Sequence, residues 1–240
     1  NSAFGHQALK ANTISSSNSA FGYRALYTNT GRNNSAFGDT ALTANISGIQ
    51  NNAFGFRSLW VNVSGNNNNA FGYAALLRNT TNANNAFGYQ AMASNTTGYR
   101  NSAFGHRALA ANTISSSNSA FGYKALYTNK GFNNSAFGSL TLTSNTTGNQ
   151  NTAFGVYALA SNTIGNSNSA FGNYGLQNNT TGDNNTSIGL NALRGNTSGK
   201  FNAAVGVNAL KNNTFGKYNN AFGGNALASN TTGYDNSAFG

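Results

Sequence analysis

The side chains that could carry out acid–base chemistry are few in this chain. It contains three Asp residues, two His residues, and no Glu or Cys. Catalysis by proton transfer and metal binding both need such groups gathered at one site. Asp39, Asp183 and Asp235 fall at different positions of the repeat described below, whereas His6 and His106 occupy one variable position in duplicated segments. We therefore expect no catalytic, metal or cofactor site, and the sequence predicts a protein that is not an enzyme.

A second set of side chains has the chemistry of a binding surface. Tyr or Trp recurs beside Arg or Lys at the variable positions 6, 7 and 10 of the repeat. Aromatic rings beside cations stack on sugars or hold anionic polymers, and the same residue types are enriched at subunit interfaces. Ligand binding, subunit contact and simple exposure to solvent all stay open as roles for this surface. Its residues are Tyr23, Arg24, Tyr27, Arg57, Trp60, Tyr73, Tyr89, Arg107, Tyr123, Lys124 and Tyr127.

The charge balance is strongly basic. Thirteen Lys and Arg against three Asp give a formal net charge of +10, which favours attraction to anionic surfaces. The cations are scattered singly, a distribution that is also typical of a solvated surface. We expect copies of the chain itself as partners, with an anionic glycan or a cell surface as a further partner and no specific nucleic acid. No apolar stretch in this segment is long enough to span a membrane.

One pentapeptide organises the whole sequence. It first reads Asn-Ser-Ala-Phe-Gly and returns with a period of sixteen or seventeen residues. Position 1 of the repeat is always Asn, position 5 is always Gly, and position 9 is Leu except at Met92. We expect residues 1–240 to form a single continuous solenoid of fourteen full repeats and a partial one, cut from a longer fibre. The repeats begin at residues 1, 18, 34, 51, 68, 84, 101, 118, 134, 151, 168, 185, 202, 219 and 236.

This period decides between helical and β architectures. Seventeen residues are too few for a pair of helices, and the large apolar residues lack helical spacing. Gly and Asn instead divide each repeat into two short arms that end in turns, which is typical of one coil of a parallel β-solenoid. The predicted fold class is therefore all-β, with one repeat per coil and coils about 4.8 Å apart. Because the apolar core of each coil is thin, we favour a homo-oligomer that buries a further face.

The constant positions predict the interior of the coils. Large apolar side chains at positions 4 and 9 are expected to point inward and to stack on their copies. The expected core residues are Phe4, Leu9, Phe21, Leu26, Phe37, Leu42, Phe54, Leu59, Phe71, Leu76, Phe87, Met92, Phe104, Leu109, Phe121, Leu126, Phe137 and Leu142. Asn at position 12 is expected to form a hydrogen-bonded ladder, and Gly at position 5 to form a bend. These ladder and turn residues are Asn12, Asn29, Asn45, Asn62, Asn79, Asn95, Gly5, Gly22 and Gly38.

The repeated words resemble those of known fibrous proteins. "NSAFG" resembles the Asn-Ser-Val-Ala-Ile-Gly words in the head domains of trimeric autotransporter adhesins. The longer unit, "NTTGxxNxAFGxxAL", is similar to repeats in phage tail fibres and large bacterial surface proteins. The resemblance covers the entire chain and implies a left-handed parallel β-roll, assembled as a homotrimer, that serves as a stalk or adhesive head.

The sequence thus favours a non-catalytic structural or adhesive fibre, located outside the cell, at a cell surface or on a virion. Its mechanism is expected to be repetition, in which a rigid rod holds many weak sites at once. An ice-binding solenoid remains an alternative because Thr recurs at positions 13 and 14. A polysaccharide-binding solenoid is a second alternative. A third, an enzymatic solenoid such as a polysaccharide lyase, would need Asp39, Asp183 or Asp235 to converge with a base in a groove.

Overall fold

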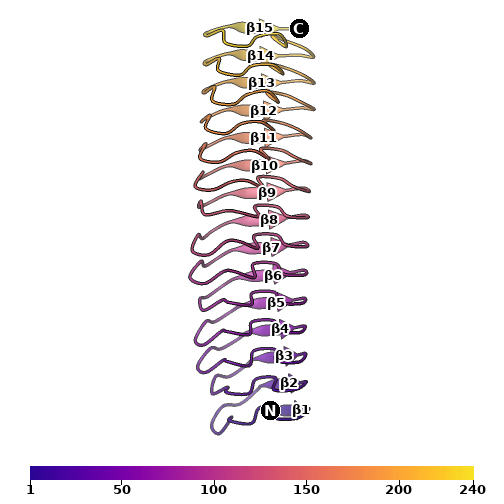
Figure 1. Ribbon diagram of the computed structural model, residues 1–240, viewed down its shortest axis with the longest axis vertical. Coiled ribbons are helices and arrows are strands. Elements are labelled where there is room, and N and C mark those ends of the chain that lie inside the picture. Colours follow the sequence, from indigo (N-terminus) through magenta and orange to yellow (C-terminus); the bar gives the residue numbers. More distant parts are fainter. The chain divides into compact units, whose positions relative to one another are not determined.

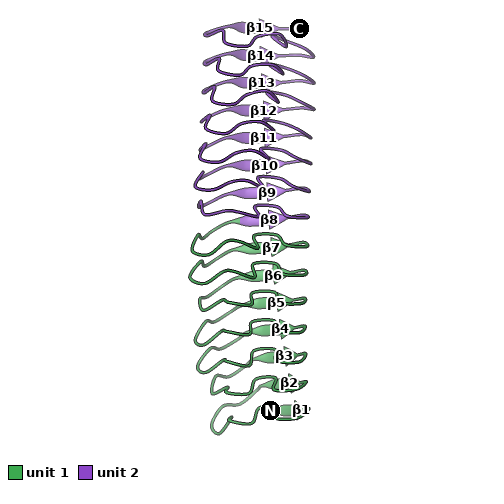
Figure 2. Cartoon of the chain, viewed as in Figure 1, with its two compact units in different colours: residues 1–118 green, residues 119–240 purple.

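A computed structural model describes all residues 1–240 as a parallel β-solenoid without helices, in which each repeat forms one coil. The solenoid divides into two compact units, residues 1–118 and residues 119–240 (Figure 2). Unit 1 contains β1 (Ser2–Phe4), β2 (Ser19–Phe21), β3 (Ser35–Phe37), β4 (Asn52–Phe54), β5 (Asn69–Phe71), β6 (Asn85–Phe87) and β7 (Ser102–Phe104). Unit 2 contains β8 (Ser119–Phe121), β9 (Ser135–Phe137), β10 (Thr152–Phe154), β11 (Ser169–Phe171), β12 (Thr186–Ile188), β13 (Ala203–Val205), β14 (Asn220–Phe222) and β15 (Ser237–Phe239). That both units belong to one uninterrupted rod stays a prediction from the repeat.

Each strand lies beside the equivalent strand of the next coil. Within either unit the strands follow chain order and pair in parallel (Figure 1), with equivalent positions opposite each other, as in Ala3 beside Ala20. Strands are only three residues long. The remaining part of each coil consists of turns and bends, so the second arm that the sequence predicts is not a strand.

The core is built from small side chains and Leu. Ala20, Ala25 and Leu26, at positions 3, 8 and 9, are fully buried, and this pattern recurs through both units. Successive strand residues point to opposite faces. Because the Ala at position 3 faces inward, the neighbouring Phe at position 4 faces outward.

The prediction that Phe lines the core is therefore wrong. Position 4 is half-buried in most coils, and Phe4 is 64% exposed. The correction applies to Phe4, Phe21, Phe37, Phe54, Phe71, Phe87, Phe104, Phe121 and Phe137. In unit 1 these rings form an outer column, with neighbouring centroids 4.6 to 5.0 Å apart. The predicted core residues at position 9, from Leu9 to Leu142 and including Met92, are buried, as the sequence predicts.

Two Asn ladders complete the interior. At position 12, Asn45 Nδ2 donates to Asn29 Oδ1 over 2.6 Å, and Asn62 Nδ2 donates to Asn45 Oδ1 over 2.9 Å. At position 1, the backbone N–H of Asn34 donates to Asn18 Oδ1, and Asn34 Nδ2 donates to the carbonyl of Gly48. These amides are fully or almost fully buried, so the ladders satisfy polar groups that would otherwise be costly to bury.

The position-12 ladder is interrupted near repeats that are one residue shorter. Repeat 68–83 is one of these, and Asn79 Nδ2 donates to the carbonyl of Thr81 in its own coil rather than to Asn62. Asn62 Oδ1 is consequently buried without a hydrogen-bond partner. Asn12 also departs from the predicted ladder, because its amide is bonded to Ser15. The ladder is thus a property of the repeat that the short coils locally break.

Gly at position 5 fits a close approach between coils. Gly22 has a φ of 132°, a conformation that side chains rarely allow, and a Cβ there would lie 2.5 Å from the carbonyl oxygen of Gly38. The same contact with the next coil recurs along both units. Both backbone angle and space therefore explain why this position is always Gly.

Candidate functional site

The segment from position 5 to position 12 turns the chain and exposes the candidate surface. In one coil, the N–H of Ala25 donates to the carbonyl of Gly22, and the N–H of Asn29 donates to the carbonyl of Leu26. The turns need left-handed backbone at positions 7 and 9, where Arg24 has a φ of 53° and Leu26 one of 52°. Positions 8 and 9 are thereby buried, while the aromatic side chains at position 6 stay exposed.

Position 6 carries an aromatic column on the surface of unit 1. His6 stacks on Tyr23, with ring centroids 5.7 Å apart. Further along, Phe56 stacks on Tyr73, Tyr73 on Tyr89 and Tyr89 on His106, at 5.5, 5.0 and 5.0 Å. The one coil between these stacks has Asp39 at position 6. Stacking follows from the register, because equivalent side chains of adjacent coils lie side by side.

Cations at position 7 lie over the rings of positions 6 and 10 in their own coil. The Arg24 guanidinium carbon is 5.2 Å from the Tyr23 ring centre and 5.3 Å from that of Tyr27. In the repeat that starts at residue 51, Arg57 lies 5.1 Å from both Phe56 and Trp60. The repeat that starts at residue 118 places Lys124 over Tyr123 and Tyr127, at 5.3 and 5.7 Å. The same aromatic–cation group is thus built three times.

Gln side chains fix the Arg side chains of this surface. Arg24 Nε donates to Gln7 Oε1 over 2.8 Å, and Arg107 Nε donates to Gln90 Oε1 over 3.0 Å, each pair joining adjacent coils. Neither Arg has a carboxylate partner, since the one ion pair in the structure joins Lys200 to Asp183. The guanidinium groups are therefore held in place while their charge stays uncompensated, a state suited to an external anion.

No family model, no curated protein and no solved structure matches this chain. Its own geometry therefore has to carry the functional argument. That geometry brings most of the predicted surface residues together in small groups: Tyr23, Arg24 and Tyr27; Arg57 and Trp60; Tyr73 and Tyr89; Tyr123, Lys124 and Tyr127. Arg107 joins through Gln90.

Several members of this surface are not among the residues that the sequence predicts for it. Gln7 and Gln90 fix the Arg residues, and His6 and His106 belong to the aromatic column. The signal that could have found them is positional, because any residue at position 6 or 7 lies beside its copy in the next coil. Residue type alone does not reveal this, since Gln and His differ in chemistry from Arg and Tyr.

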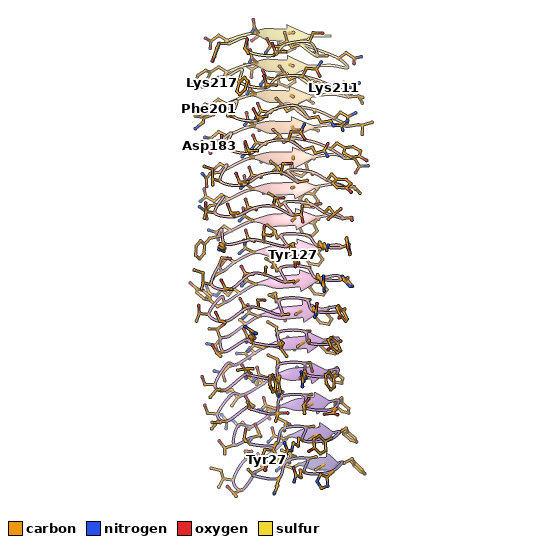
Figure 3. The ribbon with its side chains drawn as sticks, in the orientation of Figure 1. Tyr27, Tyr127, Asp183, Phe201, Lys211 and Lys217 are labelled. Atoms are coloured by element: carbon orange, nitrogen blue, oxygen red, sulfur yellow. The ribbon has the colours of Figure 1, made fainter.

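A different edge of unit 2 is formed by the tail positions 16 and 17. Asp183, Phe201 and Lys217 lie at this edge (Figure 3), and Phe201 stacks on Tyr218 with centroids 5.1 Å apart. Lys200 Nζ donates to Asp183 Oδ2 over 2.6 Å. Burial raises the pKa of Asp183, but hydrogen bonds from Lys200 and Asn166 together with the Lys200 charge outweigh it, so the pKa lies below its ordinary value. The negative charge of this carboxylate is thus already paired with a cation of the same chain.

Two of the open hollows of the surface are lined partly by cationic side chains. The larger, about 370 Å³, lies in unit 1 and is lined mainly by hydroxyl and Ile side chains together with Arg32. It includes Gly31, in the tail of a repeat that is one residue short. The smaller, about 240 Å³, lies in unit 2 and is lined by Asn178, Arg194, Gly195, Lys211 and Asn212.

The remaining candidates contribute little chemistry. No group of three or more His, Cys, Asp or Glu lies close enough together to hold a metal ion. No helix that could cross a membrane is present. Several Thr hydroxyls at position 13 donate to the carbonyl of the next coil, as from Thr163 to Thr180 over 2.9 Å. The donor groups of these hydroxyls are therefore used within the solenoid, and the ice-binding alternative stays a prediction.

Proposed function

We propose that this chain is a non-catalytic structural and adhesive fibre segment that works outside the cell. The observation that carries the proposal is the repeated aromatic–cation group at positions 6, 7 and 10. The group recurs on one kind of surface with Arg24, Arg57 and Lys124 at its centres. A surface built several times suits a partner that is itself repetitive, such as an anionic polymer or a cell surface.

Repetition supplies the strength of such a surface. A single exposed cation–aromatic contact contributes only about 0.5–1 kcal/mol. Several groups on one rigid scaffold raise the effective concentration for each further contact, so avidity replaces single-site affinity. The Asn ladders and the paired strands hold neighbouring groups at fixed separations, which reduces the entropy lost on binding.

We further propose a homotrimer with left-handed coils, in line with the resemblance to trimeric adhesins. The half-exposed Phe column supports an interface between copies, because it places an apolar ring at the same height in each coil of unit 1. The aromatic–cation surface then stays outside as the adhesive face. Both faces are outward parts of the same coil, so one repeat serves both purposes.

The adhesive role is tested by retention on an immobilised anionic polymer. We expect the full chain to dissociate slowly from a dense layer of polygalacturonate and quickly from a sparse one, measured by surface plasmon resonance. The variant Arg24→Gln/Arg57→Gln/Arg107→Gln removes three cations of the surface and should abolish slow dissociation. The matched control Arg32→Gln/Arg78→Gln/Arg100→Gln removes equal charge at other positions and should retain it. Equal loss in both variants would show net charge to be the cause, against the proposed surface.

A further inference from the structure

The smaller hollow in unit 2 places two cations in adjacent coils. Arg194 and Lys211 both occupy position 10, in the repeats that start at residues 185 and 202. Together with Asn178, Gly195 and Asn212, at position 11 of successive repeats, they line a space of about 240 Å³. Position 11 is Gly only at residue 195, and all the remaining full repeats carry a side chain there. The glycine keeps this part of the wall free of a Cβ, which would lie 2.8 Å from the carbonyl oxygen of Lys211.

The Arg194 side chain is held in place before any ligand arrives. Its Nε donates to Gln177 Oε1 over 2.9 Å, and its guanidinium carbon lies 5.2 Å from the centre of the Tyr174 ring. These contacts come from the preceding coil and fix the plane of the guanidinium group. A fixed planar group loses less entropy when it binds an anion through two parallel hydrogen bonds.

The positive charge of the hollow has no counter-charge within the chain. Unit 2 contains two Asp residues, Asp183 and Asp235, at tail positions 16 and 17. Asp183 is paired with Lys200, and Figure 3 shows Lys211 on the opposite side of unit 2 from Asp183. Equivalent backbone positions in adjacent coils are about 4.8 Å apart. Two cations attached at that separation repel each other, and an anionic group between them relieves the repulsion.

The surroundings distinguish between classes of anionic polymer. Proteins that bind single-stranded nucleic acid stack bases on free aromatic faces. Tyr174 is the ring in contact with Arg194, and the ring of Tyr157 in the preceding coil stacks on it, with centroids 5.7 Å apart. Arg194 comes from the following coil, so both faces of this ring are covered. The amides of Asn178 and Asn212 instead supply donors and acceptors for hydroxyl groups.

We propose that the hollow between Arg194 and Lys211 binds a carboxylate or sulfate group of an acidic polysaccharide. The inference rests on the proposed adhesive function and gives that function its ligand class. Arg194 holds the anionic group through its fixed guanidinium, Lys211 adds the second charge, and the two Asn side chains bond neighbouring sugar hydroxyls. The hollow acts as a single subsite, separate from the aromatic–cation groups of positions 6, 7 and 10.

The test is a titration of the full chain in solution with short oligosaccharides. Oligogalacturonate and a heparin oligosaccharide supply the carboxylate and sulfate, with neutral maltodextrin and single-stranded oligothymidylate as the comparison probes. We expect Arg194→Gln/Lys211→Gln to weaken binding of an acidic sugar by at least about tenfold and to make its salt dependence shallower. The matched control Lys130→Gln/Lys217→Gln removes two charges elsewhere in unit 2 and should change affinity less than about twofold. Lys211→Gln alone serves as the second variant if the double variant melts earlier than the control.

Each other outcome overturns either the inference or the adhesive function on which it rests. Equal weakening by the hollow and control variants would assign binding to net charge, and maltodextrin binding as tightly would remove the role of the anion. Tighter binding of oligothymidylate with the same dependence on Arg194 and Lys211 would make the hollow a nucleic-acid phosphate site. The hollow variant could dissociate from dense polygalacturonate as slowly as the wild-type chain and bind short acidic sugars with the same affinity. That result would reject the hollow as a binding site and leave the adhesive function supported. If short sugars bind at the hollow without slow dissociation from the dense layer, the adhesive function fails while the subsite stands.

Discussion

At the scale of single residues, one exchange in the interior of the solenoid is matched by a change in the neighbouring coil. Position 8 is Gly at residue 175, and it is Ala, Ser or Thr in all the remaining full repeats. The coil that follows has Ser187 at position 3, where Ala is usual, and its hydroxyl donates to the carbonyl of Ala192 over 2.8 Å. A Cβ on Gly175 would lie 2.8 Å from the Ser187 oxygen. The missing methyl group and the additional hydroxyl therefore compensate each other.

This pair predicts a measurable coupling energy. Gly175→Ala alone should lower the free energy of unfolding by about 1–2 kcal/mol, because the new methyl group displaces the fully buried Ser187 hydroxyl. In a Ser187→Ala background the same change should be neutral or stabilising, since Ala restricts the unfolded chain more than Gly. Urea unfolding of the four proteins measures both values. Additive effects of the two substitutions would contradict the compensation.

The ion pair of Asp183 predicts a small dependence of stability on pH. The folded state lowers the pKa of this carboxyl from its ordinary value of 3.8. Its contribution is therefore present above that value and is lost as pH falls through the lower folded pKa. Lys200→Gln should reduce the free energy of unfolding by less than about 1 kcal/mol at neutral pH. Once Asp183 is protonated, the substitution should leave the free energy of unfolding unchanged.

The control for this effect is Lys217→Gln, which removes a Lys at the same repeat position without an ion pair. Unfolding by urea at neutral and strongly acidic pH compares the two variants. A difference between them that persists in acid would show that Lys200 acts through packing rather than through charge.

At the scale of the coil, burial divides the two large apolar positions. Leu76 and Phe71 belong to the same repeat, but Leu76 is fully buried and Phe71 lies in the outer column. Leu76→Ala should cost about 2–5 kcal/mol of unfolding free energy because it leaves a cavity. Phe71→Ala should cost about 1–2 kcal/mol, from partial burial and stacking. An equal or larger loss for Phe71→Ala in chemical unfolding would put the ring back in the core.

One bend of unit 1 holds an Ala in a backbone conformation that is less strained for Gly. Ala83 has a φ of 58°, in the left-handed region, whereas Ala93 lies outside that region. Ala83→Gly should raise the free energy of unfolding by about 1 kcal/mol. Ala93→Gly is the matched control, since both side chains are half-buried, and should lower it by about 0.5–1 kcal/mol. The same sign for both substitutions in thermal and urea unfolding would refute this assignment.

The coil also marks how far sequence reasoning reaches. The period, the Gly and the Asn predict a parallel solenoid with an Asn ladder, and both are present. Hydrophobicity alone puts Phe inside, but a three-residue strand has one inward residue, and Ala at position 3 takes that place. Positions 1 and 12 fill much of the remaining interior with amides. The choice between Ala and Phe depends on the width of the closed coil, which no single repeat reveals.

The candidate surface was accessible to sequence reasoning for a related reason. Variable positions of a repeat are free of core constraints, so Tyr, Trp and Arg at positions 6, 7 and 10 stand out. The pairing of Arg24 with Gln7, and the hollow at Arg194 and Lys211, depend on contacts between successive coils. Such contacts become visible only when the repeats are stacked in register.

At the scale of the whole molecule, the proposed trimer predicts a mass. Light scattering at micromolar concentration should give three times the chain mass of 24.8 kDa. Phe71→Ser/Phe87→Ser, which interrupts the outer column, should shift the particle towards a single chain. Arg32→Gln/Arg100→Gln, which changes other surface positions, should leave the mass at three chains. A wild-type mass of one chain would remove the trimer and leave the Phe column as a solvent-exposed stack.

The in-register pairing of equivalent residues has a consequence for how the gene can change. Ala20 lies beside Ala36 just as Ala36 lies beside Ala53, so within a unit each junction between coils has the same strand pairing. Unequal recombination between repeats would insert or delete whole coils without creating a new kind of junction. Residues 1–50 and 101–150 are close copies, as expected if such events have occurred. The number of coils is then the property of this protein that changes most readily between generations. Each added coil brings another set of outward side chains on which selection can act.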